Sequence, residues 1–227
     1  MYQKIHIFDT ERCLQELNWM VEKNVKIIDV ADSNFGIFDR DEKFVDFLID
    51  KKQKGEFNGS FMPTWAKNSP NKVIKLAKKL QKNDIDKIFG FSLQSTNPET
   101  LEKVKRKNIY NLDGFATVLK DLKKDSISTY TEIIFPLPGD TKESFIKGLH
   151  QILDMPDTFE MLQINNLSRL SNTELSDISG LIWAKIKGTG KPYENQVIDE
   201  ICVSTENLSK EDVFELLFYS KCFLIPM

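Results

Sequence analysis

The fold is decided by the stretch Thr131-Glu-Ile-Ile-Phe-Pro-Leu-Pro-Gly-Asp-Thr-Lys-Glu-Ser-Phe145. An apolar, strand-like run ends in a Pro-Leu-Pro-Gly turn, and a helix is predicted to begin directly after it. Asp140 or Thr141 can cap that helix, and Glu143 stands three residues after Asp140, at capping-box spacing. Glu132 places a carboxylate inside the strand. The stretch therefore predicts a strand–turn–helix unit whose free helix N–H groups suit a polar or anionic ligand.

The same alternation of strands and helices recurs along the chain. Strands are predicted over 25–31, 59–65, 87–93, 128–135 and 159–165, and helices over 10–23, 39–52, 71–81, 98–105, 112–123 and 143–154. Such an order implies parallel strands joined by right-handed crossovers. A doubly wound sheet and a barrel both satisfy it, and both place their sites after the strand ends.

The alternation stops after Asn165. Residues 170–178 are polar, and residues 180–193 contain three glycines and a proline. A sixth strand is predicted over 197–205. Ser209-Lys-Glu-Asp212 is predicted as a capping box that opens a last helix, running through Phe218 and Cys222.

Composition restricts the function classes. The formal net charge is -3 and lysines alternate with acids, so no nucleic-acid partner is predicted. No run approaches the roughly 20 apolar residues that cross a bilayer, and the N-terminus lacks the apolar core of a signal peptide. We therefore expect a cytoplasmic protein without a membrane partner. Cys13, Cys202 and Cys222 and the two histidines have no metal-ligand spacing, so no metal site is predicted.

Polar side chains follow every predicted strand. They are Asp32 and Asn34, Lys67 and Asn68, Gln94 and Ser95, Glu132, and Asn165 and Asn166, with Arg106 one helix later. Any one of them is explained as a helix cap or a solvated loop residue. Together they favour a polar ligand site across the strand ends. Gln94 and Glu132 matter most, because a buried amide or carboxylate is costly without a hydrogen-bond partner.

Four stretches resemble, in this order and spacing, the radical SAM enzymes. They are Asp32-Ser-Asn-Phe-Gly36, Trp65-Ala-Lys-Asn-Ser69, Phe91-Ser-Leu-Gln-Ser95 with Arg106-Lys-Asn108, and Glu132-Ile-Ile-Phe-Pro-Leu-Pro-Gly-Asp-Thr141. The resemblance covers about residues 9–175 and is nearest to the branch that often carries a cobalamin-binding domain. It implies an α/β fold, a partial TIM-type (β/α)6 barrel of parallel strands over 1–175, with a C-terminal extension over 176–227 packing on it. S-adenosylmethionine (SAM) and a [4Fe–4S] cluster would occupy the barrel mouth.

The resemblance also implies a role for each cofactor-binding residue. Asp32 and Asn34 match positions near the amine of SAM and the cluster. Gln94 and Glu132 match positions that hydrogen-bond its ribose or methionine end, and Arg106 matches a carboxylate-binding arginine. Pro138 and Gly139 match the turn beside the adenine, and Asn166 lies where the backbone of the sixth strand meets it.

The sequence departs from the family at the cluster. The family holds its cluster with a Cys-x3-Cys-x2-Cys loop after the first strand, and this sequence contains neither that loop nor that strand. We therefore expect either a fragment of a longer enzyme or a degenerate relative, inactive in radical chemistry as this polypeptide alone. The edge of the strand at 25–30 is expected to be covered by the N-terminal residues, the C-terminal tail or another chain.

Three functions are open at this point. The first is the core of a radical SAM enzyme, a cobalamin-dependent methyltransferase or a mutase-like relative, acting on a small-molecule substrate. The second is a non-catalytic barrel that serves as a binding or scaffold protein. The third is an unrelated barrel lyase, which requires a metal site or a Schiff-base lysine, for which Lys67 is the plausible position.

Overall fold

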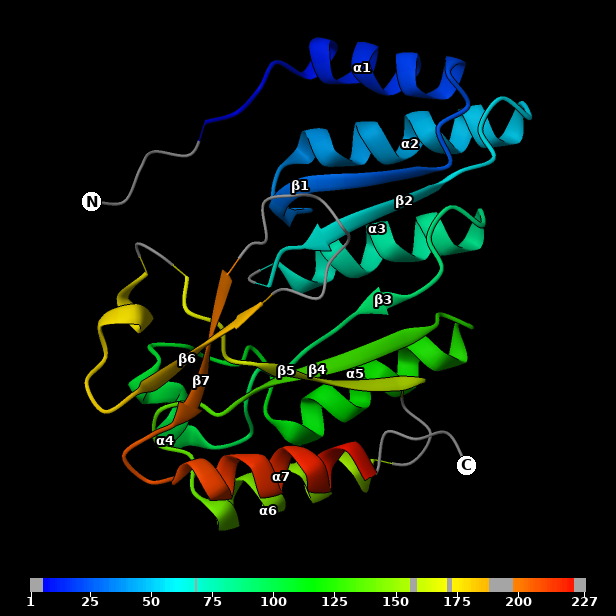
Figure 1. Ribbon diagram of the computed structural model, residues 1–227. Helices are drawn as coiled ribbons and strands as arrows, with labels where there is room; N and C mark the ends of the chain where they lie inside the picture. Colours follow the sequence, from blue (N-terminus) through cyan, green and yellow to red (C-terminus); the bar gives the residue numbers. More distant parts are fainter. Residues whose placement is uncertain (1–5, 68, 156–158, 171–172, 188–197, 223–227) are drawn as a thin grey trace. The chain divides into compact units, whose positions relative to one another are not determined.

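The computed structural model describes residues 6–67, 69–155, 159–170, 173–187 and 198–222 (Figure 1). The chain divides into two compact units, Met1–Phe89 and Gly90–Met227. Each unit is built on parallel strands, as the alternating pattern predicts.

The first unit contains a parallel strand pair and its helices. Its elements are α1 (Thr10–Glu22), β1 (Ile27–Phe35), α2 (Asp39–Gln53), β2 (Ser60–Trp65) and α3 (Pro70–Lys82). β1 pairs with β2 from Ile27↔Ser60 to Val30↔Pro63, and again at Phe35↔Trp65 after an irregularity. The structure extends β1 beyond the predicted 25–31, so the segment expected to be a loop belongs to the strand. Asp9 caps α1, because its side chain accepts a hydrogen bond from the Arg12 amide.

The second unit has a three-stranded sheet in the order β3–β4–β5. Its first elements are β3 (Phe89–Gly90), α4 (Pro98–Lys103), α5 (Leu112–Lys124), β4 (Thr129–Phe135), α6 (Lys142–Leu153) and β5 (Met161–Asn166). β4 and β5 pair in parallel, from Tyr130↔Met161 to Phe135↔Asn166. The predicted strand over 87–93 is regular only at Phe89–Gly90, with an isolated parallel bridge at Gln94↔Ile133.

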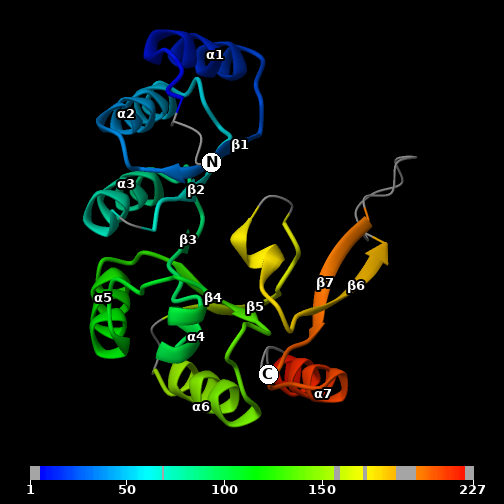
Figure 2. The same cartoon turned by 90° about the vertical axis from the view of Figure 1, so that its left-hand side faces the viewer.

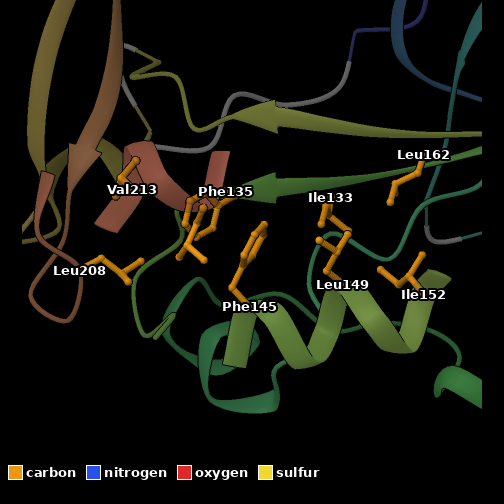
Figure 3. Packing of buried hydrophobic residues seen from close by; sticks show 9 residues of the cluster. Ile133, Phe135, Phe145, Leu149, Ile152, Leu162, Leu208 and Val213 are labelled. Atoms are coloured by element: carbon orange, nitrogen blue, oxygen red, sulfur yellow. The ribbon is translucent and has the colours of Figure 1, made fainter. Parts of the chain in front are cut away.

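The C-terminal part contributes to the core of this unit. α7 (Lys210–Cys222) begins at the predicted Ser209–Asp212 capping box, in which the Asp212 amide donates to Ser209 Oγ at 3.1 Å. Leu208, Val213 and Leu216 pack into the cluster formed by β4 and α6 (Figure 3). One face of β4 is therefore buried against helices.

The segment after β5 forms an antiparallel pair, which differs from the prediction. η1 (Glu174–Asp177) is followed by β6 (Ile182–Lys187), which pairs with β7 (Ile198–Ser204). The expected strand over 197–205 therefore exists but does not join the parallel sheet. Figure 2 shows this pair beyond the end of β5. Leu181 and Trp183 pack on Leu137 and Leu167 there.

The α/β class with parallel strands is confirmed. The described strands form three sheets, β1–β2, β3–β4–β5 and β6–β7, and closure of the parallel strands into a partial barrel stays a prediction.

Candidate functional site

Glu132 lies on a polar face of the second unit. Along β4, Thr129, Thr131, Ile133 and Phe135 are buried, while Tyr130, Glu132 and Ile134 are half-buried on the opposite face. Because paired residues of neighbouring strands point to the same side, the pairs Glu132↔Gln163 and Ile134↔Asn165 put all four side chains on one face. We call this face, with Tyr130 and Met161, the polar face of β4–β5.

Three polar side chains form a chain of hydrogen bonds on the polar face. Asn165 Nδ2 donates to Glu132 Oε2 at 3.0 Å, and Gln163 Nε2 donates to Asn165 Oδ1 at 2.9 Å. Asn165 thereby orients one carboxylate oxygen of Glu132. Its role follows from the parallel register, which the sequence does not reveal.

The turn after β4 is fixed by a buried carboxylate. Asp140 is 3% exposed, and its two oxygens accept from the Leu137 amide at 2.9 Å and from Thr100 Oγ1 at 2.8 Å. Burial raises the pKa of Asp140 to about 6, although these two hydrogen bonds lower it. Asp140 therefore ties the turn to α4 instead of capping α6.

The cap of α6 is Thr141, one of the two candidates from the sequence. Its Oγ1 accepts from the Ser144 amide at 3.1 Å, and its own amide donates to Ser144 Oγ at 2.8 Å. The box partner is thus Ser144, and the expectation for Glu143 was wrong. With Asp140 committed to the turn, the box begins one residue later.

Gly139 has a conformation that requires glycine. Its φ is +94°, and a Cβ built on it would lie 3.0 Å from Lys103 Cδ and 3.4 Å from Thr100 Cα. A pocket of about 190 Å³ opens beside this turn, and its walls include Lys103, Pro138, Gly139, Leu181, Thr205 and Glu206. The predicted residues Pro138 and Gly139 thus border a real concavity.

Gln94 lines neither the pocket beside Gly139 nor the polar face of β4–β5. It is 8% exposed, with φ +71°, and its carbonyl accepts from the Ile134 amide at 3.1 Å. Its side chain lines a small cavity with α6 residues Phe145, Gly148 and Leu149, which belong to the helix-covered side of the sheet.

The other predicted residues are more exposed. Arg106 is exposed just after α4, where its amide donates to the Leu101 carbonyl at 2.8 Å. Asn166 is the exposed last residue of β5. In the first unit, Asp32 Oδ1 accepts from the Asn34 amide at 2.9 Å near the end of β1. The structure thus brings Pro138 and Gly139 together at one pocket and places Glu132 on the polar face of the same unit.

The cysteines do not assemble a ligand set among the described residues. Cys13 is half-buried on α1, and Cys202 is buried on β7, where burial raises the pKa of its thiol. The Cys222 side chain lies outside the described residues. Over the described ranges, no group of three or more His, Cys, Asp or Glu side chains could hold a metal ion. None of the helices described there is long and apolar enough to cross a membrane.

Two curated relatives have named activities. The chain is 33% identical over 152 residues to the 2-(S-pantetheinyl)-carbapenam-3-carboxylate methyltransferase of Streptantibioticus cattleyicolor, covering 66% of this chain and 22% of that protein. It is 32% identical over 171 residues to TokK of Streptomyces tokunonensis, a cobalamin-dependent radical SAM methyltransferase, covering 74% and 24%. The chain is a relative of the radical SAM enzymes. It spans about a quarter of the length of these curated relatives.

Solved radical SAM structures share the fold. TsrM from Kitasatospora setae, a radical SAM methyltransferase solved with cobalamin and a [4Fe-4S] cluster bound, superposes with a TM-score of 0.61 at 12% identity. The match covers 96% of this chain and 46% of TsrM. No protein-family model matches the chain. The structural similarity to TsrM therefore extends over nearly the whole chain.

Proposed function

We propose that this chain is the SAM-binding core of a cobalamin-dependent radical SAM methyltransferase. The similarity to curated radical SAM methyltransferases supports the proposed enzyme family. The single observation that carries the site is the half-buried Glu132 carboxylate, oriented by Asn165 at 3.0 Å on the polar face of β4–β5. A carboxylate there is suited to accept hydrogen bonds from the ribose hydroxyls or the amine of SAM.

The proposed architecture is the partial (β/α)6 barrel over 1–175, with 176–227 packing on it. In both units one face of the parallel strands is buried under helices, and the other carries polar or exposed side chains. In the first unit Ile28 and Phe61 are buried, while Ile27 and Met62 are 62% and 50% exposed. In this proposal the exposed face lines the interior of an open, partial barrel, where a ligand instead of packed side chains would cover it. We also propose that the N-terminal residues, the C-terminal tail or another chain covers the free edge of β1. The protein is proposed to be cytoplasmic.

The residues fit SAM in the following way. Glu132 binds its ribose or methionine end, Pro138 and Gly139 border the base with Asn166, and Arg106 binds the carboxylate. Asp32 and Asn34 lie near the amine. Gln94 acts indirectly, because its side chain lies on the helix-covered side of the sheet and holds the strand end in place. An arginine suits a carboxylate because its guanidinium offers a planar fork of donors.

The residues do not fit a [4Fe–4S] cluster, which needs three thiolates and one open iron site. Cys13 and Cys202 lie on separate units, and burial raises the pKa of the Cys202 thiol, which opposes formation of the thiolate that iron requires. We therefore assign no radical step to these residues and propose that this polypeptide alone binds SAM without cleaving it. Cobalamin is proposed from the relatives, and no residue here is assigned to it.

The substrate class proposed is a small molecule. The curated relative from Streptantibioticus cattleyicolor is named for a carbapenam carboxylate, and the pocket of about 190 Å³ beside Gly139 is of a size that suits part of a small molecule. The lyase interpretation has no support from these relatives, which are methyltransferases.

Calorimetric titration with SAM tests the site. Glu132→Gln keeps an acceptor for Asn165 but removes the charge, so we expect SAM affinity to fall at least about tenfold, as for a lost charged hydrogen bond. The matched control is Glu160→Gln, an exposed acid just before β5, which should bind like the wild type. Equal affinity of the Glu132 and Glu160 variants would refute the site. No binding by the wild type would favour the scaffold alternative.

A further inference from the structure

The Gln94 side chain has a donor group that lacks an acceptor within the described part of the chain. Its Nε2 is buried, and the residue as a whole is 8% exposed. A buried amide N–H without an acceptor costs roughly 1–3 kcal/mol. Native proteins satisfy almost all such groups, either with protein atoms or with ordered water.

The backbone around Gln94 is held firmly. Gln94 has a φ of +71°, which is unfavourable for a residue with a Cβ, and its carbonyl accepts from the Ile134 amide. The next residues are tied as well, because Asn108 Nδ2 donates to the Ser95 carbonyl at 2.8 Å. These contacts fix the direction in which the Cα–Cβ bond of Gln94 leaves the backbone.

Gln94 borders a cavity whose size and polar lining suit one water molecule. The cavity has a volume of about 20 Å³ and lies between residues 94–97 and α6, where Thr96, Asp140 and Ser144 also line it. A single water needs at least about 10–15 Å³ and two to four polar partners. Thr96 is also placed tightly, since a Cβ on Gly148 would lie 2.2 Å from its Oγ1. The Thr96 side chain thus packs directly against α6 at Gly148.

We propose that this cavity binds one internal water, which accepts a hydrogen bond from Gln94 Nε2 and donates to acceptors among Thr96, Asp140 and Ser144. The water joins the strand end at Gln94 to the turn fixed by Asp140 and to the start of α6. Gln94 is then a positioning residue, and it touches water instead of SAM. Only this last statement rests on the proposed function.

The first test is a high-resolution crystal structure of the wild-type polypeptide. We expect density for a water within hydrogen-bond distance of Gln94 Nε2. A protein acceptor at that atom, or a cavity without density, would overturn the water site. This measurement does not depend on SAM binding, so it can fail or succeed separately from the proposed function.

The second test compares Gln94→Met with the matched control Gln15→Met. Methionine keeps the length of glutamine but has no N–H donor, and Gln15 is an exposed glutamine on α1. We expect Gln94→Met to lose the water and to speed amide hydrogen exchange in residues 94–97 and 142–149. Gln15→Met should leave exchange in both segments unchanged. Unchanged exchange in Gln94→Met would contradict the proposal.

SAM affinity separates positioning from direct contact. If Gln94 acts through the water, Gln94→Met should weaken SAM binding less than about threefold. A loss of tenfold or more with the water still present would mean that Gln94 contacts SAM directly, and would sink the positioning role. If the wild type binds no SAM, the proposed function fails, while the water site stands or falls on the crystal structure.

Discussion

At the scale of single residues, buried carboxylates are the most consequential groups. Asp140 uses both oxygens to hold the turn, whereas Asp86 uses only one. Asp86 Oδ1 accepts from the Lys87 amide at 2.8 Å, and Oδ2 is buried without a partner among the described residues. Asp86 therefore has the burial of Asp140 without its full set of hydrogen bonds.

Asp86 makes stability depend on pH. Burial raises its pKa to about 6, above the roughly 3.9 of an unfolded aspartate. The folded protein binds this proton more tightly than the unfolded one, so the contribution of Asp86 is present below about pH 4 and lost as pH rises through about 6. We expect Asp86→Asn to raise the free energy of unfolding at pH 7, by up to about 3 kcal/mol, and to flatten its pH dependence between pH 4 and 6.

Urea denaturation across this pH range measures the effect. The control is Asp29→Asn, an exposed acid on β1, which should keep the wild-type dependence. A pH slope that persists unchanged in Asp86→Asn would show that the burial argument is wrong.

Gly139 provides a second test at residue scale. Gly139→Ala meets both an unfavourable left-handed backbone and the crowding of Thr100 and Lys103, so we expect a loss of roughly 2–3 kcal/mol. Gly55 has φ +75° and nothing within 4 Å of a built Cβ, so Gly55→Ala should cost only about 1 kcal/mol. Thermal unfolding compares the two, and equal losses would mean that the turn is not crowded.

At the scale of elements, the sequence predicted most helices well because their signals are local. α2 was expected over 39–52 and is found at Asp39–Gln53, and the helix expected over 98–105 begins at Pro98, with Asn97 as its cap. β6 was missed because it lies in a glycine-rich stretch. Its alternating Ile-Trp-Ala-Lys-Ile-Lys sequence is a strand signal that flanking glycines obscured.

The site was less predictable than the helices. Glu132 stands out as a charge in an apolar strand, but its link to Asn165 depends on the register between β4 and β5. The direction of Gln94 depends on a positive φ that no residue type at that position announces. Long-range pairing and unusual backbone conformations are set by tertiary contacts, so a single sequence does not specify them.

α7 should be essential for the core of the second unit. Leu216 is 2% exposed and packs in the cluster of β4 and α6, so Leu216→Ala should lower the free energy of unfolding by roughly 2–5 kcal/mol. Phe214 on the same helix is 57% exposed, and Phe214→Ala should change it by no more than about 0.5 kcal/mol. Guanidinium denaturation measures both. A small loss for Leu216→Ala would contradict its packing in the cluster of β4 and α6.

At the scale of the whole molecule, the radical SAM relationship and the cysteine positions lead to a clear expectation. Incubation of this polypeptide with iron and sulfide under anaerobic conditions should give no stable cluster, because the sequence lacks the Cys-x3-Cys-x2-Cys loop. Visible absorption and iron content measure the outcome. A stoichiometric cluster that survives gel filtration would overturn it, and loss of that cluster in Cys202→Ser would identify a ligand.

The pocket beside Gly139 has walls from two different segments of the chain. Pro138 and Gly139 belong to a turn immobilised by Asp140, while Leu181, Thr205 and Glu206 come from segments flanking the β6–β7 pair. Substitutions in those flanking segments can therefore reshape one wall while the opposite wall keeps its geometry. The segments flanking β6–β7 can therefore vary in evolution, or be changed by an engineer, to alter the shape of the pocket. The turn at Pro138 and Gly139 must be kept, because it fixes the opposite wall.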